Sequence, residues 1–344
     1  MKRFLFVLAS SLVSLLFVAC KVDFNPNATW RNIPVVYCVV DPEEDTVYAR
    51  LHRCYLSEDN MLQYITVVDS NTYPEGEVSL VMNSYDDNNQ LRHTWTFVPA
   101  GLTDTQSVAT HALYYCIPGQ ELRQDTGCMF QLLVIDNSTG DTLATATTTL
   151  VGFRQKVRMG SDSVEQVLLT PSNSRNNIFG YRTGCRGEIK WNTVPRGRRY
   201  QPILTFYYQK LGDTLSIQIP GSTLNNANNS SIMNTYSISQ NRLLSYVRNA
   251  LVDNRDTLHT VDHVDITIAV ANEDLNAYLA AQQAQTSSQT NFTSYTNVQG
   301  GHGIFASRRT HLTTRVPCDS VGKPGYLPSE LKNLHVGFSG DWGE

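Results

Sequence analysis

Short segments in which apolar and polar residues alternate recur from residue 34 to residue 151. The first two, residues 34–40 and 46–55, are rich in β-branched and aromatic residues, and the turn-forming residues Asp41 to Asp45 separate them. This order predicts a β-hairpin. Because similar short segments follow without a long helical pattern between them, residues 34–152 are predicted to form a β-sandwich of immunoglobulin-like type. The later segments, each bounded by Gly, Pro, Asn or Asp, are residues 63–68, 77–83, 91–98, 111–116, 128–135 and 143–151.

The pattern changes in residues 153–344, where helical periodicity appears among the strands. Residues 240–253 repeat apolar positions at intervals of three and four after a capping Ser239, which predicts an amphipathic helix. Residues 273–284 predict a second helix, capped by Asn272. The second domain is therefore predicted to be β-rich with two helices, and the whole chain to be mainly β. Strands are predicted at residues 164–169, 188–191, 203–209 and 264–270.

The first twenty residues predict export. Lys2 and Arg3 precede an apolar run over residues 4–19, which is shorter than the roughly 20 residues that a spanning helix needs. The run ends in Leu-Phe-Val-Ala before Cys20, and this ending resembles the lipobox of bacterial lipoproteins. We therefore expect residues 1–19 to be a signal peptide, Cys20 to carry acyl chains such as palmitate, and residues 20–33 to form a lipidated tether. An ordinary secretory signal followed by an incidental cysteine is the alternative.

Six cysteines remain in the mature chain after Cys20. An even number in an exported protein permits three disulfides. Two disulfides are favoured because each would join two neighbouring predicted strands. The two remaining cysteines would then pair with each other. Free buried thiols are the alternative, and no Cys-x-x-Cys motif points to redox or zinc chemistry. The predicted pairs are Cys38 with Cys54, Cys116 with Cys128, and Cys185 with Cys318.

Composition argues against several partners. Only 17% of the residues are charged, against about 25% in typical domains, so uncharged polar residues supply the polarity. The formal net charge is -4, and it becomes -6 when Lys2 and Arg3 leave with the signal peptide. A mildly acidic chain without a long basic run is not expected to bind nucleic acid. Attachment to a membrane is expected through the lipid rather than through charge.

The densest cluster of potential ligands is a weak candidate for a metal site. If residues 259–265 form a regular strand, His259, His263 and Asp265 share one face and could bind a transition metal. The solvent face of an edge strand is the simpler interpretation, and we expect neither a metal nor another cofactor. Gly300, Gly301 and Gly303 could approach a ligand, but they fit a turn that enters a buried strand better.

A triplet of Asp, then Ser or Thr, then an aliphatic residue occurs six times. Asp suits the end of a turn and the following residues suit the start of a strand, which is a structural explanation. The triplet also resembles the acceptor for O-glycosylation that Bacteroidetes use on exported proteins, and both explanations can hold together. The candidate acceptors are Thr46, Thr142, Ser163, Thr214, Thr257 and Ser320.

Several runs together resemble a family of Bacteroidetes cell-envelope lipoproteins whose domain has no known function. The resemblance rests on the run that ends at Cys20, on Pro34 to Asp41, on Trp191 with the aromatic residues 200–208, and most of all on Tyr295 to Arg308. The chain departs from the family in its cysteines and at Tyr37-Cys38, where a glycine is common. The resemblance implies an outer-membrane lipoprotein encoded near transporters of the TonB-dependent kind, and it carries no catalytic residue over.

These features predict a lipid-anchored outer-membrane protein, on the cell surface rather than the periplasmic face. No nucleophile elbow, zinc-protease helix, phosphate loop or dinucleotide fingerprint is present in the sequence. We therefore expect the protein not to be an enzyme. We expect a non-catalytic interaction or accessory subunit of an envelope transport or assembly complex. Its expected partner is an outer-membrane barrel or another envelope protein. An adhesin or surface-layer component is the alternative, and an enzyme that acts on glycans or peptides is a more distant one.

Overall fold

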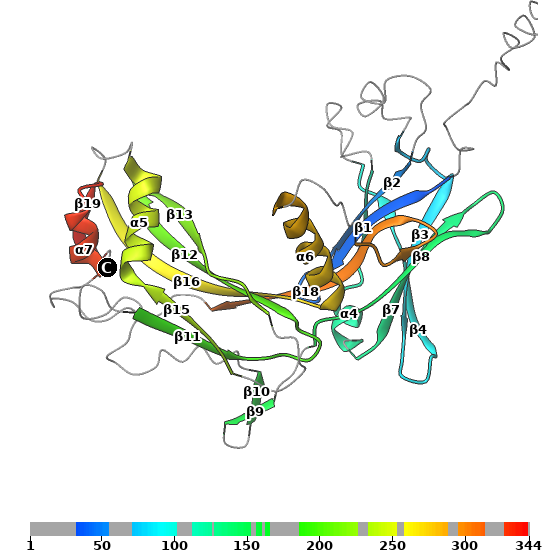
Figure 1. Ribbon diagram of the computed structural model, residues 1–344, viewed down its shortest axis with the longest axis horizontal. Helices are drawn as coiled ribbons and strands as arrows, with labels where there is room; N and C mark the ends of the chain where they lie inside the picture. Colours follow the sequence, from blue (N-terminus) through cyan, green and yellow to red (C-terminus); the bar gives the residue numbers. More distant parts are fainter. Residues whose placement is uncertain are drawn as a thin grey trace, which may run out of the picture.

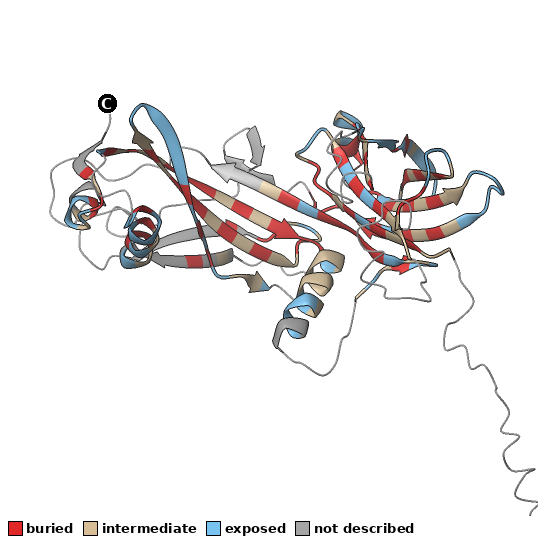
Figure 2. Ribbon diagram, turned by 90° about the horizontal axis from the view of Figure 1, so that it is seen from above, coloured by how far each residue is buried: buried red, intermediate tan, exposed pale blue. Residues whose placement is uncertain are grey.

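The chain folds into a mainly β structure, as the sequence predicts (Figure 1). Alternation of buried and exposed residues along the strands places one face of each of the two largest sheets against a core (Figure 2). The computed structural model describes residues 32–54, 71–101, 112–125, 127–152, 156–159, 162–165, 186–225, 233–252, 258–287, 295–313 and 327–342. The predicted strand at 63–68 lies outside these residues.

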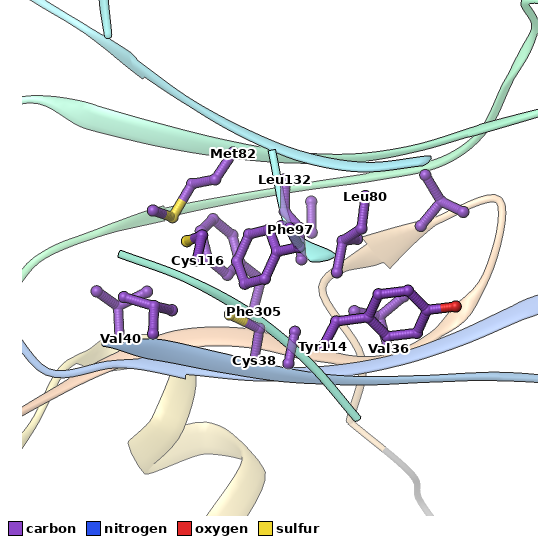
Figure 3. Close-up of a cluster of buried hydrophobic side chains, with 14 of the residues drawn as sticks. Val36, Cys38, Val40, Leu80, Met82, Phe97, Tyr114, Cys116, Leu132 and Phe305 are labelled. Carbon is purple, nitrogen blue, oxygen red and sulfur yellow. The ribbon is translucent and has the colours of Figure 1, made fainter. Parts of the chain in front are cut away.

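Two sheets enclose the N-terminal core. One face is the end of a ten-stranded sheet, and the other is a five-stranded sheet, with the buried side chains of both between them (Figure 3). At this end the larger sheet contains β1 (Pro34–Val40), β2 (Val47–Arg53), β6 (Leu113–Cys116) and β5 (Val98–Pro99). The smaller sheet runs in the order β17 (Val298–Gln299), β8 (Thr142–Thr149), β7 (Met129–Asp136), β3 (Val78–Tyr85) and β4 (Leu91–Thr96). A short helix, α4 (Gln120–Gln124), precedes β7.

The N-terminal sandwich is completed by residues from near the other end of the chain. β18 (His302–Thr313) pairs in parallel with β1 through its first half, so that Val36 lies opposite Gly303 and Cys38 opposite Phe305. Its second half pairs antiparallel with β16 (His259–Ala271). One strand therefore joins both parts of the large sheet, and a domain boundary at residue 152 leaves out a strand of the first core.

The second part of the molecule packs the helices of residues 240–251 and 327–333 and a small sheet around its own core. Trp191, Tyr200 and Phe206 are among the largest fully buried side chains there. Both predicted helices are present, as α5 (Gln240–Leu251) and α6 (Glu273–Ser287), and the Leu275 amide donates to the capping Asn272 Oδ1 at 3.0 Å. The other elements are β9 (Lys156–Met159), β10 (Asp162–Glu165), β11 (Arg186–Asn192), β12 (Arg199–Lys210), β13 (Asp213–Pro220), β14 (Leu224–Asn225), β15 (Met233–Ser239), α7 (Leu327–Asn333) and β19 (Phe338–Trp342).

Candidate functional site

The predicted metal cluster does not assemble. A β-bulge interrupts the pairing of β12 with β16, where Phe206 lies opposite Val264 but Tyr208 lies opposite Val261. Two residues of β16 therefore stand against one of β12, and a bulge of this kind reverses which face the following side chains occupy. His259 is consequently buried in the core against Tyr208 and Phe338. The prediction that His259, His263 and Asp265 share one face is wrong, because it assumed a regular strand.

His263 lies on the opposite face, between two carboxylates. Its ring stacks on Tyr207 with 4.3 Å between ring centroids. Its Nδ1 lies 3.1 Å from Asp262 Oδ1 and its Nε2 lies 3.5 Å from Asp265 Oδ1. His259 instead places Nδ1 2.9 Å from the Val336 carbonyl oxygen. In the described part of the chain, no group of three or more His, Cys, Asp or Glu side chains is arranged to hold a metal ion.

The four described cysteines are free thiols, so two of the predicted disulfides are corrected. The Cys54 amide donates to the Ile33 carbonyl, five residues before Cys38 on β1. That separation is about 16 Å along a strand, whereas disulfide-bonded Cα atoms lie within about 7 Å. Cys116 ends β6 in one sheet of the first core and Cys128 directly precedes β7 in the other, and such sheets lie about 10 Å apart. Cys185 and Cys318 lie outside the described residues.

We expect all four thiols to be recovered unpaired. Burial raises the pKa of the Cys38 thiol far above its ordinary value and that of Cys116 to about 12, so these thiols stay protonated and unreactive in the folded protein. Half-buried Cys54 should react with iodoacetamide first, and Cys38, Cys116 and Cys128 only after unfolding without reductant. Peptide mapping by mass spectrometry measures this order. A peptide that links Cys38 to Cys54 would contradict the structure.

Three of the six Asp-Ser/Thr triplets lie where a turn becomes a strand, in parts of the chain where the exposure of the side chains is known. Thr46 precedes β2, Thr142 begins β8, and Thr214 is the second residue of β13. Thr142 and Thr214 are exposed, and Thr46 is half-buried. The structural explanation of these three triplets therefore holds, and their glycosylation stays a prediction. Ser163 lies in β10, whereas Thr257 and Ser320 are outside the described residues.

The lipid-attachment residue Cys20 also lies outside the described residues, so acylation stays a prediction. Within the described part, no helix is both long enough and apolar enough to cross a membrane.

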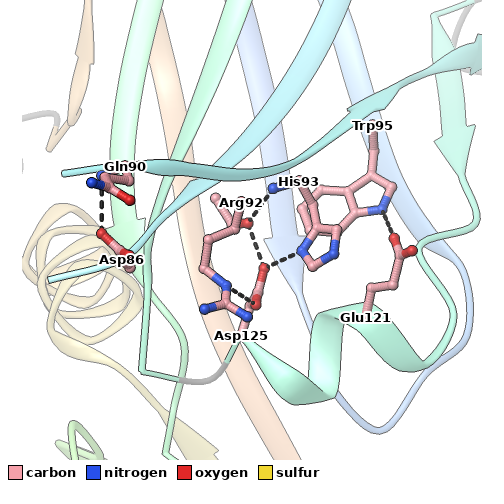
Figure 4. A network of polar contacts seen from close by, with 8 residues as sticks. Asp86, Gln90, Arg92, His93, Trp95, Glu121 and Asp125 are labelled. Atoms are coloured by element: carbon pink, nitrogen blue, oxygen red, sulfur yellow. Dashed lines mark hydrogen bonds and ion pairs between the residues drawn. The ribbon is translucent and has the colours of Figure 1, made fainter. Parts of the chain in front are cut away.

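A buried carboxylate organises a polar network at the edge of the five-stranded sheet (Figure 4). Asp125 follows helix α4 and is fully buried. Its Oδ2 accepts hydrogen bonds from Ser84 Oγ at 2.5 Å and from His93 Nδ1 at 2.7 Å. Its Oδ1 accepts from Arg92 Nε at 3.0 Å. Burial alone would raise the pKa of this carboxyl, but the bonds from Ser84 and His93 and the charge of Arg92 outweigh burial and hold the pKa below its ordinary value.

This network ties α4 to the hairpin of β3 and β4. Glu121 on the same helix accepts a hydrogen bond from Trp95 Nε1 at 3.1 Å, and the Trp95 ring stacks against His93. Although Ser, His and Asp meet here, the serine donates to the carboxylate rather than to the imidazole. A serine relay requires the histidine to accept the hydroxyl proton. The geometry therefore fits a structural clamp and not an activated nucleophile.

The best candidate for a functional surface is the outer face of β1, β2, β6 and β5. We call this surface the tyrosine face and define it by Tyr37, Tyr48, Arg50, Val98 and Tyr115. Tyr48 is 55% exposed and Val98 45%. Cross-strand pairing places Tyr115 between them, and Tyr37 lies directly opposite Arg50. Tyrosine on a rigid sheet supplies contact area at a low cost in side-chain entropy, and both tyrosine and arginine are enriched at protein interfaces.

Helix α6 borders the tyrosine face and covers the neighbouring strand. Ile304 and Ala306 on the outer side of β18 are almost fully buried, whereas Tyr37 on β1 remains 40% exposed. Tyr278 of α6 contacts Tyr37 edge to face, with 6.4 Å between ring centroids. Helix α6 therefore covers the outer face of the sheet over β18, whereas the tyrosines on β1 and β2 are exposed to solvent.

Arg50 carries the positive charge of this surface at neutral pH. His52 follows on the same side of β2, where burial and the nearby Arg50 lower its pKa from the ordinary value of a histidine. It is consequently neutral at pH 7. Burial also raises the pKa of Tyr37, so its hydroxyl stays protonated and can donate a hydrogen bond. The surface can bind a partner by aromatic packing, hydrogen bonds and one cation.

Sequence patterning alone did not identify this surface. The alternation of Tyr48, Arg50 and His52 against Val47, Ala49 and Leu51 marks the two faces of β2, and that signal was available. It does not show that β6 and β5 extend the same face, because β6 pairs with β2 across 63 to 69 positions of the chain and β5 then pairs with β6 across 15 to 17.

Comparisons with known proteins leave the family open. No family model matches the chain, and no curated protein does. One solved structure that is similar in part is a DUF4785 family protein from Legionella pneumophila, with 11% sequence identity and a TM-score of 0.18. The match covers 66% of this chain and 49% of that protein, about half of its length. At this score it supports no argument about fold or function, and the resemblance to Bacteroidetes lipoproteins stays a prediction.

Proposed function

We propose that this protein is a non-catalytic lipoprotein of a bacterial outer membrane that binds another envelope protein through the tyrosine face. The observation that carries the proposal is the exposure of Tyr48 and Tyr37 on a sheet whose other side is a packed core. Single exposed apolar residues are common on protein surfaces, but a continuous group rich in Tyr with an Arg is typical of binding sites.

The sequence supports a proposal for the place of the protein in the cell. Cys20 after its apolar run supports attachment by acyl chains, and we propose the outer membrane, with the cell surface favoured over the periplasmic face. A tether of residues 20–33 would leave the folded part free to meet a membrane protein beside the anchor. An outer-membrane barrel is the partner we propose first.

Removal of aromatic rings from the tyrosine face should break the complex. We expect crosslinking of cells, followed by detergent extraction and mass spectrometry, to recover the wild-type protein with one stoichiometric envelope partner. Tyr48→Thr together with Tyr115→Thr should lower recovery of that partner at least tenfold, because central aromatic residues contribute about 2 kcal/mol or more each to protein interfaces. Threonine retains strand propensity, so the sheet should remain folded.

Leu91→Thr is the matched control. Leu91 begins β4 in the other sheet and is 56% exposed, and its replacement should leave recovery of the partner unchanged. Recovery of the wild-type protein as a monomer without an envelope partner would refute the subunit proposal. Binding of intact foreign cells that is lost in the double variant would instead support an adhesin.

A further inference from the structure

The tip of the hairpin between β12 and β13 combines two unfavourable features. Lys210 pairs with Asp213, so Leu211 and Gly212 form a two-residue turn. Both have positive φ, 54° for Leu211 and 95° for Gly212. Asn, Asp or Gly normally occupies the first position of such a turn, because a leucine there is strained. Leu211 is also 85% exposed, so neither local geometry nor burial explains a leucine at this position.

Other exposed apolar side chains lie around the same turn. Lys210 pairs with His259 across β12 and β16, so the next residues outward, Leu211 and Leu258, adjoin at the end of the ladder. Leu258 is 65% exposed. Leu215 on β13 and Val252 at the end of α5, which packs against β13, are 40% and 39% exposed. We call Leu211, Leu215, Val252 and Leu258 the tip patch.

We propose that the tip patch inserts into the interfacial layer of the lipid bilayer to which the protein is anchored. The most exposed member, Leu211, lies in the turn at the end of a hairpin, a position that can enter a deformable lipid surface. Lys210 and, one turn before Val252, the exposed Arg248 lie beside it, as basic residues do around the apolar part of interfacial segments. The proposal rests on the proposed lipid attachment at Cys20, which would hold the patch near a membrane at high effective concentration.

Lipid contact at the tip would orient the molecule rather than anchor it. Acyl chains on Cys20 would already give stable attachment. A second contact on the distal part of the large sheet would restrict how the rigid β12, β16 and β18 strands stand relative to the membrane. The tyrosine face, at the other end of the same sheet, would then be held in a limited range of orientations.

The test uses the full lipidated protein in vesicles of phosphatidylethanolamine and phosphatidylglycerol that contain a lipid with a diazirine in its acyl chain. After illumination, mass spectrometry locates the lipid adducts. We expect adducts on the peptide that contains Leu211 and on the lipidated N-terminal peptide. In the variant Leu211→Asn with Leu258→Ser, labelling of the tip should fall at least tenfold, because burial of one leucine contributes about 1.5–3 kcal/mol.

Controls separate the possible failures. Leu211→Asn should leave the melting temperature unchanged or raise it, because asparagine tolerates positive φ, so loss of labelling cannot be attributed to unfolding. Leu91→Ser, an exposed leucine on another sheet, should keep tip labelling at the wild-type level. Adducts on the N-terminal peptide alone would overturn the tip proposal while supporting the anchor. Adducts on neither peptide, with the protein released from vesicles, would refute lipid attachment itself. Crosslinks from position 211 to a protein instead of lipid in outer-membrane fragments would also overturn the tip proposal.

Discussion

Replacement of Gly303 by alanine is expected to lower the free energy of unfolding by about 3–5 kcal/mol, because both packing and backbone geometry oppose a side chain there. A Cβ on Gly303 would stand 1.9 Å from the Val36 carbonyl oxygen, and φ at this residue is +107°. The contact is with backbone, which cannot move aside without breaking the pairing of β1 with β18. Urea titration followed by circular dichroism measures the change.

Gly212→Ala is the matched control, because it separates strain from collision. Gly212 has a similar φ of +95°, but nothing lies within 4 Å of a Cβ built there. Its replacement should lower the free energy of unfolding by only about 1–2 kcal/mol. Equal losses in the two variants would show that β18 does not pack against β1 as the structure describes.

Removal of the Asp125 carboxylate should be the second most damaging change. Asp125→Ala leaves the fully buried Ser84 hydroxyl and the His93 ring without their hydrogen-bond acceptor and separates Arg92 from its counter-charge. We expect the free energy of unfolding to fall by about 2–4 kcal/mol at pH 7. The decrease is smaller than for a completely buried ion pair, because Arg92 is 46% exposed. Glu44→Ala, which removes an exposed carboxylate in the turn between β1 and β2, should change stability little.

The stabilisation by Asp125 should depend on pH in a defined direction. Because the folded protein lowers the pKa of this carboxyl, its contribution is fully present above the pKa of an unfolded aspartate, about 3.9, and is lost as the pH falls through the lower folded value. The stability difference between wild type and Asp125→Ala should therefore be constant from pH 7 to about pH 5 and shrink below pH 4. A difference that grew toward acid pH would contradict this assignment.

Local patterns predicted the elements of this fold better than their connections. Alternation in residues 34–40 and 46–55 gave the first hairpin, and the period of residues 240–253 gave α5, because both signals come from neighbours in the chain. The parallel pairing of Val36 with Gly303 involves residues 267 positions apart. The glycines of residues 300–303 did predict a turn into a buried strand, and Phe305 is indeed fully buried. Sequence could not show which strand would receive it.

The errors at the candidate site have the same origin. Assigning His259 and His263 to one face required a regular strand, and the bulge depends on how β12 meets β16 rather than on β16 alone. The Cys38–Cys54 pair was inferred because their two strands are neighbours. In the register of the hairpin, however, Cys38 lies opposite Ala49 and Cys54 lies beside Ile33, so the two cysteines are far apart along the strands. Asp125 was not identified from sequence, because its partners come from β3 and β4, more than 30 residues earlier in the chain.

The shared strand β18 also determines the order in which the protein can fold. Synthesis begins at the N-terminus, so β1 and β8 are made long before residues 298–307, which lie between them in the finished sandwich. Until those residues arrive, the edges of β1 and β8 that they will cover have no partner from this chain, and unpaired edges attract other strands. The N-terminal half must therefore wait, incomplete and prone to aggregate, for about 150 further residues. Protection of these edges during that interval is as much a requirement for a working molecule as the final packing.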